Sequence, residues 1–394
     1  MIYADNAATT KMSPHAIEVM AETAQELWGN PSSLYELGQR AQEALSDARS
    51  RMAGILGAEA KEIYFTSGGS ESDNQAIRSC ARLGAAKDKR HIISTAFEHH
   101  AVLHTLKRLE KEGYEVTYLP VHENGIVTAD EVKAAIRPDT CLVTIMFANN
   151  EIGTIQPVQE IGAVCRASKV PFHTDAVQAA GHVPIDVKAM NLDLLSLSAH
   201  KFHGPKGVGV LYCRTGLPLY PLIEGGAQER NRRAGTENLI GIRAMVAALE
   251  DMARDMDKNA AYVSRLRNRL MAGLEKVPHC ALNGDRTCRL PGNVNFCFEG
   301  IEGESLLLLL DQAGICASSG SACTSGSLDP SHVLLAIGRP HEVAHGSLRL
   351  TLCEENTEAD VDAILTEVPR IVDYLRGFSP IWQDLEAGRR QHLL

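Results

Sequence analysis

The stretch IYFTSGGSESDN, residues 63–74, indicates the fold class of this chain. A β-prone run, Ile63 to Thr66, passes through two glycines into residues that can begin a helix. Glycines let a backbone approach a ligand closely, and the free amides of a helix N-terminus favour an anion, so this turn is a candidate phosphate site. Glycine and serine also form ordinary strand-to-helix turns, and the motif alone leaves both interpretations open.

The same alternation of β-prone runs and helical patterns continues from about residue 60 to residue 215. The other predicted strands are His91–Thr95, Cys141–Phe147, Val170–Thr174 and Leu194–Ser198. Between the second and third strands, four apolar residues fall on one helical face before Gly113: Val102, Leu103, Leu106 and Leu109. This order predicts an α/β domain with a mainly parallel sheet.

The pattern changes after the hairpin-like GPKGVGVLYC at residues 204–213. Two helices, roughly 238–256 and 260–277, are expected to lead into a smaller α+β domain. Its predicted elements are the strands Val294–Phe298 and Leu348–Leu352, a Leu-rich helix from Glu304 and a terminal helix capped by Thr357. We therefore expect a large domain, 14–258, and a small domain formed by 1–13 and 259–394.

Composition narrows the function classes. The chain has 394 residues, 44% of them hydrophobic, and a formal charge of −10, which argues against a nucleic-acid partner. The N-terminus shows no targeting pattern and no apolar run is long enough to cross a bilayer, so a cytoplasmic protein without a membrane partner is expected. The 10 cysteines lack paired CxxC spacing, and most of them, such as Cys141 and Cys165, are expected to be reduced core residues.

Polar residues follow each predicted strand, where ligands gather in open α/β sheets. The later segments of this kind are EHH at 98–100, NNE at 149–151, Asp175 with Gln178, and SAHKFHGPKG at 198–207. Lys201 could form a Schiff base if it is desolvated, but it could also reach solvent, and Lys206 is an equally basic competitor. Asp175 could cap a helix or pair with a protonated ring nitrogen, and His99 could be structural or an acid and base.

One cysteine lies in a segment of small residues, SSGSACTSGS at 318–327. Such a segment buries little, so we expect an accessible loop with a reactive Cys323. The alternative is a Ser/Gly linker with an incidental cysteine.

Taken together, these motifs resemble the cysteine desulfurases of the class V aminotransferase family, and among them the NifS-like branch whose persulfide cysteine lies in an SSGSAC loop. The resemblance runs through nearly the whole chain, in DNAATT, GNPSSLY, TSGGSESDN, NNEIG, HTDAVQ, SAHKFHGPKGVG, QERNRRAGTEN, SSGSACTSGSLDPSHVL, AHGSLRLTL and SPIW.

The resemblance implies a homodimeric, fold-type I enzyme dependent on pyridoxal 5'-phosphate, with a seven-stranded sheet in the large domain. Lys201 corresponds to the lysine that binds the cofactor, Asp175 to the partner of the ring nitrogen and Gln178 to the donor to the ring hydroxyl. His99 would stack on the ring and assist proton transfer. Asn150 would lie near ring and substrate, and Arg349 would bind the substrate carboxylate. The implied phosphate contacts are Gly69, Ser70, Ser198, His200 and, from the neighbouring subunit, Thr236.

The implied reaction takes sulfur from L-cysteine, releases alanine and holds the sulfur as a persulfide on Cys323 for an acceptor such as an iron-sulfur scaffold protein. A selenocysteine lyase and an aminotransferase are alternative activities on the same fold. A non-enzymatic sulfur carrier or scaffold is a further alternative.

Three positions depart from the family pattern. Ser70 stands where a Thr is more frequent and keeps the hydroxyl group. LTLCEENTE, residues 350–358, replaces a more familiar stretch, which puts the exit of that strand in doubt at Cys353. Cys316 stands where a small apolar residue is commoner, and we interpret it as a core residue rather than a second redox thiol.

Overall fold

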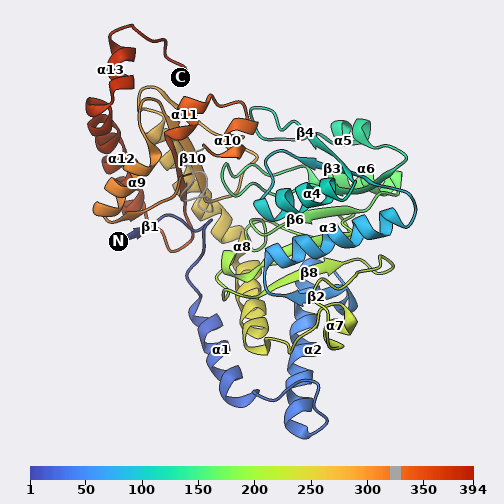
Figure 1. Cartoon of the computed structure of the whole chain (residues 1–394). Coiled ribbons are helices and arrows are strands. Elements are labelled where there is room, and N and C mark those ends of the chain that lie inside the picture. The colour runs from blue at the N-terminus through green and yellow to red at the C-terminus, as the bar shows by residue number, and fades with distance from the viewer. Residues whose placement is uncertain (320–329) are drawn as a thin grey trace.

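The computed structural model describes residues 1–319 and 330–394 (Figure 1). Its centre is a seven-stranded sheet with the order β2-β8-β7-β6-β5-β3-β4. The strands are β2 Ile63–Thr66, β3 His91–Thr95, β4 Glu115–Leu119, β5 Thr140–Thr144, β6 Phe172–Asp175, β7 Leu194–Ser198 and β8 Gly209–Cys213. β4, β3, β5, β6 and β7 run parallel to one another, and β8 is antiparallel to both β7 and β2. The predicted sheet class and the five predicted strands are confirmed, but β5 ends at Thr144 rather than Phe147, and β6 spans Phe172–Asp175 rather than Val170–Thr174.

Helices cover both faces of this sheet. The helices of this part of the chain are α1 Pro14–Glu26, α2 Glu36–Leu56, α3 Gly69–Ala85, α4 His100–Lys111, α5 Ala129–Ala135, α6 Val158–Ser168 and the short α7 Gln228–Asn231. Neighbouring strand residues enter opposite cores: Leu194 packs in the cluster under α3 and α4, while Leu195 packs in the cluster under α2. The strands are therefore apolar on both faces, as expected of a parallel sheet between helical layers.

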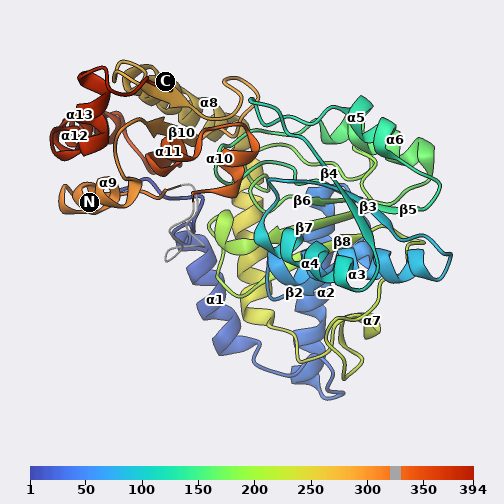
Figure 2. The same cartoon turned by 45° about the horizontal axis from the view of Figure 1, so that its top comes forward.

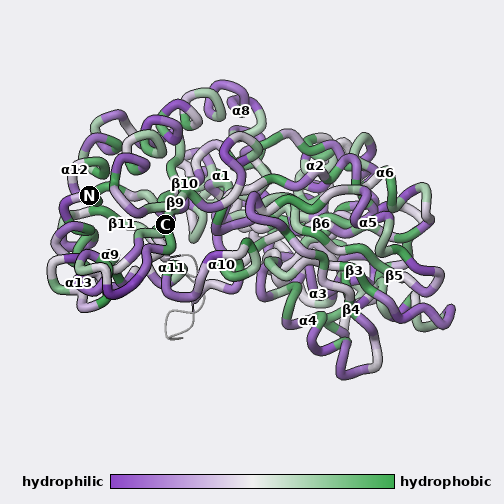
Figure 3. The backbone as a smooth tube through the Cα atoms, turned by 90° about the horizontal axis from the view of Figure 1, so that it is seen from above, coloured by the Kyte–Doolittle hydropathy of each residue, from purple (hydrophilic) through white to green (hydrophobic). Residues whose placement is uncertain are grey.

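A second core belongs to the C-terminal part. The antiparallel sheet β12-β10-β9 consists of β12 Ser347–Thr351, β10 Asn293–Phe298 and β9 Cys280–Leu282, and β1 Ile2–Tyr3 pairs with β11 Ile315–Cys316. Its helices are α9 Gly303–Gln312, α10 His332–Ala336, α11 His341–His345, α12 Glu358–Phe378 and α13 Pro380–Glu386. Thr357 caps α12 in a capping box with Asp360, which confirms that prediction. Figure 3 shows the alternation of hydrophilic and hydrophobic residues along α12.

One helix connects the two cores. α8, Leu239–Leu274, is continuous over 36 residues, so the prediction of two separate helices is wrong. The segment around residue 258 contains neither glycine nor proline, so the helix continues through it. Figure 2 shows α8 reaching from the sheet to the C-terminal part. Leu249 packs in the first core and Leu266 in the second. The division at residue 258 stays a prediction.

The cysteines that the structure describes are all free, and Cys141 and Cys165 are buried as expected. The doubtful exit of β12 is ordered by hydrogen bonding: the amide of Cys353 donates to Asn356 Oδ1 at 2.9 Å. Glu354 pairs with His203 Nε2 at 3.2 Å. Across the described ranges, no helix has the length and apolar character needed to span a membrane.

Candidate active site

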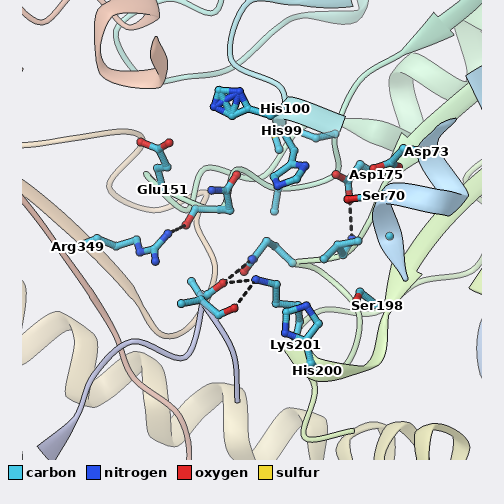
Figure 4. Close-up of a pocket in the computed structure, with 18 of the residues that line it drawn as sticks. Ser70, Asp73, His99, His100, Glu151, Asp175, Ser198, His200, Lys201 and Arg349 are labelled. Carbon is cyan, nitrogen blue, oxygen red and sulfur yellow. Dashed lines mark hydrogen bonds between the residues drawn. The ribbon is translucent and has the colours of Figure 1, made fainter. Parts of the chain in front are cut away.

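A cavity of about 440 Å³ lies at the carboxyl ends of the parallel strands (Figure 4). Its lining includes these residues predicted from the sequence: Gly69, Ser70, His99, Asn150, Asp175, Gln178, Ser198, His200, Lys201 and Arg349. They come from loops after β2, β3, β5, β6 and β7 and from strand β12. The residues that follow β2, β3, β5, β6 and β7 meet because these strands end at one edge of the sheet. Strand β12 of the C-terminal part adds Arg349, which is 280 positions from Gly69.

The turn between β2 and α3 requires glycine. Gly68 has φ +153° and ψ −179°, a conformation essentially restricted to glycine. A Cβ atom on Gly69 would lie 2.5 Å from Val177 Cγ2, so a side chain there would clash. Ser70 follows in the first turn of α3, where backbone amides have no partner within the helix. The turn therefore presents amide groups to the cavity in a form suited to an anion.

Lys201 follows β7 in a short 3₁₀ turn, Ala199–Lys201. Its Nζ donates hydrogen bonds to the carbonyl oxygens of Ala7 at 2.6 Å and Ala8 at 2.8 Å, so the N-terminal segment forms one wall of the site. Lys206 is exposed and lines a different cavity, next to Lys11 and Cys353. The geometry therefore distinguishes the two lysines that composition could not.

Asp175 ends β6, lines the same cavity and is buried. Its Oδ1 accepts the amide hydrogen of Val177 at 2.9 Å. Burial raises the pKa of Asp175 to about 6, and the amide of Val177 and the charge of Lys201 oppose this rise. Gln178 Nε2 donates to the carbonyl of Ala7 at 3.0 Å, which ties the loop after β6 to the N-terminal wall.

His99 is the N-cap of α4, and its Nδ1 accepts the amide hydrogen of Ala101 at 3.1 Å. Burial, together with the charge of Lys201, lowers the pKa of His99 to about 4. The imidazole is therefore neutral near pH 7. Because Nδ1 accepts a hydrogen bond, the single ring proton is on Nε2. This group can donate a hydrogen bond from Nε2 but is a poor base at that atom.

Arg349 lies on β12 and is only 2% exposed. Its guanidinium group pairs with Asp5 at 2.9 Å and donates to the carbonyl of Asn150 at 3.1 Å. Its Nε is buried and has no hydrogen-bond partner within the described chain. A buried donor left unpaired is energetically unfavourable, so Arg349 is arranged for an additional anionic ligand.

Several lining residues were missed by sequence reasoning, above all Asp73, His100, Glu151 and His332. Asp73 lies inside the helix that follows the glycine turn, where an acid looks like an ordinary helix residue. Glu151 belongs to the NNE segment, so its position after a strand was a usable signal. Burial raises the pKa of Glu151 to about 7, and the hydroxyl of Ser331 donates a short hydrogen bond to it.

Two predicted residues do not line this cavity. Thr236 lines another one, together with Ser67, Gly207 and Gly235. Cys323 lies outside the described residues.

The cavity residues fit pyridoxal 5'-phosphate. The glycine turn suits a phosphate group, Lys201 provides the amine, and Asp175 provides a buried carboxylate. With a mainly parallel seven-stranded sheet, this arrangement is that of a fold-type I pyridoxal-phosphate-dependent enzyme.

Comparisons with known proteins agree with this class. The sequence profile of the aminotransferase class-V family matches residues 2–364. The cysteine desulfurase IscS of Methanosarcina thermophila is 56% identical over 96% of this chain and 94% of its own length. The cysteine desulfurase IscS of Clostridium botulinum is 54% identical over 99% of both chains.

Solved structures are also similar. A NifS-like protein superposes with a TM-score of 0.89 at 38% identity, covering 95% of this chain and 100% of its own. SspA in complex with cysteine gives a TM-score of 0.80 at 36% identity, covering 89% of this chain and 99% of its own. The chain belongs to the aminotransferase class-V family, and within it to the cysteine desulfurases.

Proposed function

We propose that this chain removes sulfur from L-cysteine, releases L-alanine and holds the sulfur as a persulfide on Cys323. The observation that carries the proposal is the buried, unpaired Nε of Arg349 in the same cavity as Lys201. An amino acid needs a partner for its carboxylate and an amine-reactive centre nearby, and these two residues supply both. The relatives named cysteine desulfurase and the neighbour solved with cysteine support this substrate.

The chain's own residues divide into three groups by role. Gly69, Ser70, Ser198 and His200 would hold the phosphate group, with Thr236 supplied by the partner in a homodimer. Asp175 would keep a proton on the ring nitrogen, and Gln178 would donate to the ring hydroxyl. Bound pyridoxal phosphate supplies an electron-withdrawing ring that stabilises negative charge on the substrate's α-carbon. These residues therefore set the position and charge of that ring.

Proton movement falls to Lys201 and His99. After the Lys201 amine is released by the incoming substrate, its Nζ can take the α-proton as a base. His99 is neutral with its proton on Nε2, so we propose that it positions the substrate and donates a hydrogen bond rather than removing the α-proton. Asn150 lies beside Arg349, and its side chain would complete the substrate contacts.

Sulfur transfer balances without an external oxidant. The thiolate of Cys323 attacks the substrate sulfur, a sulfur-sulfur bond forms and the substrate's carbon-sulfur bond breaks. The electron pair of that bond stays with the substrate, whose β-carbon takes up a proton and becomes the methyl group of alanine. The persulfide would then pass to an acceptor, such as an iron-sulfur scaffold protein, in the cytoplasm.

Mass spectrometry after incubation with L-cysteine tests this function. We expect one added sulfur on Cys323, release of alanine in equal amount and no requirement for a keto acid. Cys323→Ala should abolish the added sulfur, while Cys288→Ala, which removes an exposed thiol that does not line the cavity, should not. A strict keto-acid requirement would indicate an aminotransferase, and turnover of selenocysteine alone would indicate a selenocysteine lyase.

A further inference from the structure

A second carboxylate lies directly behind Asp175. Asp73, in the first half of α3, is 1% exposed and lines the same cavity. Ligand-type atoms of Asp73, Asp175 and His99 all lie within 4.8 Å of one another. Figure 4 shows the carboxyl groups of Asp73 and Asp175 side by side. The cofactor chemistry described above uses Asp175 and leaves Asp73 without a role.

The two carboxyl groups have different surroundings. Asp175 accepts an amide hydrogen and faces the charge of Lys201, and both interactions favour its ionised form. Asp73 has one side-chain hydrogen bond, with Ser196, but its Oδ1 is buried and has no hydrogen-bond partner within the described chain. An ionised oxygen there would be left without compensation, whereas a carboxylic acid tolerates the position better.

Asp73 also has no cationic neighbour at contact distance in the described chain. The nearest basic group is His173 Nε2, 3.6 Å away. His173 is fully buried, burial lowers its pKa to about 3, and its ring nitrogens contact Thr144 Oγ1 at 2.8 Å and Ser196 Oγ at 3.0 Å. A neutral imidazole cannot balance a negative charge on Asp73.

The remaining acid in the neighbourhood is Glu98, which follows β3 and is 0% exposed. It accepts hydrogen bonds from Thr95 Oγ1 and the amide of Met146. Burial raises the pKa of Glu98 to about 8, so it is mostly protonated near pH 7. Glu98 therefore offers no charge that would change the assignment of the proton between Asp73 and Asp175.

We propose that Asp73 is a positioning residue that remains a neutral carboxylic acid and thereby keeps Asp175 as the ionised partner of the ring nitrogen. Two buried carboxylates at this separation cannot both be ionised without strong repulsion, so one of them holds a proton. The contacts assign that proton to Asp73. This inference rests on the proposed role of Asp175, which it deepens.

The unfolding of the cofactor-free protein tests the protonation state directly. An unfolded aspartate loses its proton near pH 4, whereas folded Asp73 would keep it. Asp73 then makes the folded state less stable as the pH rises from about 4 toward 8. Asp73→Asn is always neutral and has nearly the same shape, so its stability should fall less steeply with pH and should equal or exceed that of the wild type at pH 7.

The proposal would be overturned if Asp73→Asn were less stable than the wild type by the same amount at every pH. That result would mean that Asp73 is ionised or has only a structural role. If Asp73→Asn fails to fold, Asp73→Ser is measured with the same criterion. The apoprotein contains no cofactor and performs no reaction, so this outcome is independent of whether the proposed function is correct.

Cofactor absorbance in the reconstituted protein gives a second measurement. A neutral Asp73 predicts that Asp73→Asn keeps the wild-type absorption maximum and its pH midpoint. Asp73→Leu, which removes the polar group, should shift that midpoint. Asp175→Asn, the control for the ring-nitrogen partner, should change the spectrum strongly. A spectrum of Asp73→Asn that matches Asp175→Asn would contradict the proposed assignment of charge.

Discussion

The two ends of the active-site cavity are built on opposite principles. At the end supplied by the large sheet, the acids Asp73 and Asp175 lie side by side in a buried region, and Asp73 Oδ1 has no hydrogen-bond partner within the described chain. At the end supplied by β12, Arg349 is compensated by Asp5 and Asn150 but keeps one unused donor. The comparison shows that an unfavourable buried polar group can either hold a proton or remain available to bind a ligand.

We expect the largest loss of activity for Lys201→Ala, which removes the amine that lies between the two ends of the cavity. We expect turnover to fall by more than about 1,000-fold, because the base and covalent attachment point are both lost. Alanine release from L-cysteine and borohydride trapping of the cofactor measure it. Lys206→Ala is the matched control and should keep both signals. If Lys206→Ala lost both signals to the same extent, the choice between Lys201 and Lys206 as the cofactor-binding lysine would be open again.

Glu151→Gln tests the effect of burying a carboxyl group apart from its effect on anion binding. Glu151 lies near Arg349, but its hydrogen-bond partner is Ser331. Its pKa is raised from 4.5 to about 7, so the folded state holds a proton that the unfolded state has lost over this range. Its contribution to stability is present below about pH 4.5 and lost as the pH rises toward 7, by up to about 3 kcal/mol. Denaturant unfolding of the apoprotein should show a flatter pH profile for the variant. An unchanged slope would show that Glu151 is ionised when folded.

Arg349→Lys examines the anion-binding end. Lysine keeps a charge for Asp5 but lacks the planar fork that binds a carboxylate through two donors. We expect KM for L-cysteine to rise about 30-fold, equivalent to about 2 kcal/mol, with a smaller change in kcat. Steady-state kinetics decide the point. A fall in kcat with unchanged KM would place Arg349 in the reaction rather than in binding.

Thr357→Ala tests whether the end of the cavity that contains Arg349 of β12 depends on the stability of helix α12. The variant removes the N-cap of α12, and about 1 kcal/mol of stability should be lost. Thermal unfolding measures this loss, and the cofactor spectrum should not change. A change in the spectrum would mean that the two ends of the cavity are coupled through α12.

Much of this architecture is predictable from local sequence signals. Strands buried on both faces appear as continuous apolar runs, and the polar residues that follow them, such as Asp175 and Lys201, identify the edge where the cavity forms. The capping residue Thr357 is recognisable because its partner lies only three positions away.

What escapes prediction depends on distant contacts. Asp73 becomes distinctive only when β6 places Asp175 beside it, and no feature of the helix sequence reports this. The contacts of Lys201 with Ala7 and Ala8 join segments more than 190 residues apart. The prediction of two helices within α8 fails because the segment between them contains no glycine or proline to end the helix.

The unbroken α8 has a mechanical consequence. At 36 residues it is a rod about 54 Å long, and both hydrophobic cores pack against it. A proteolytic cut near residue 258 would halve this rod and leave each half with fraying ends, so neither fragment should retain its core. The two cores should therefore melt together in a single calorimetric transition, and thermal loss of one should carry the other with it.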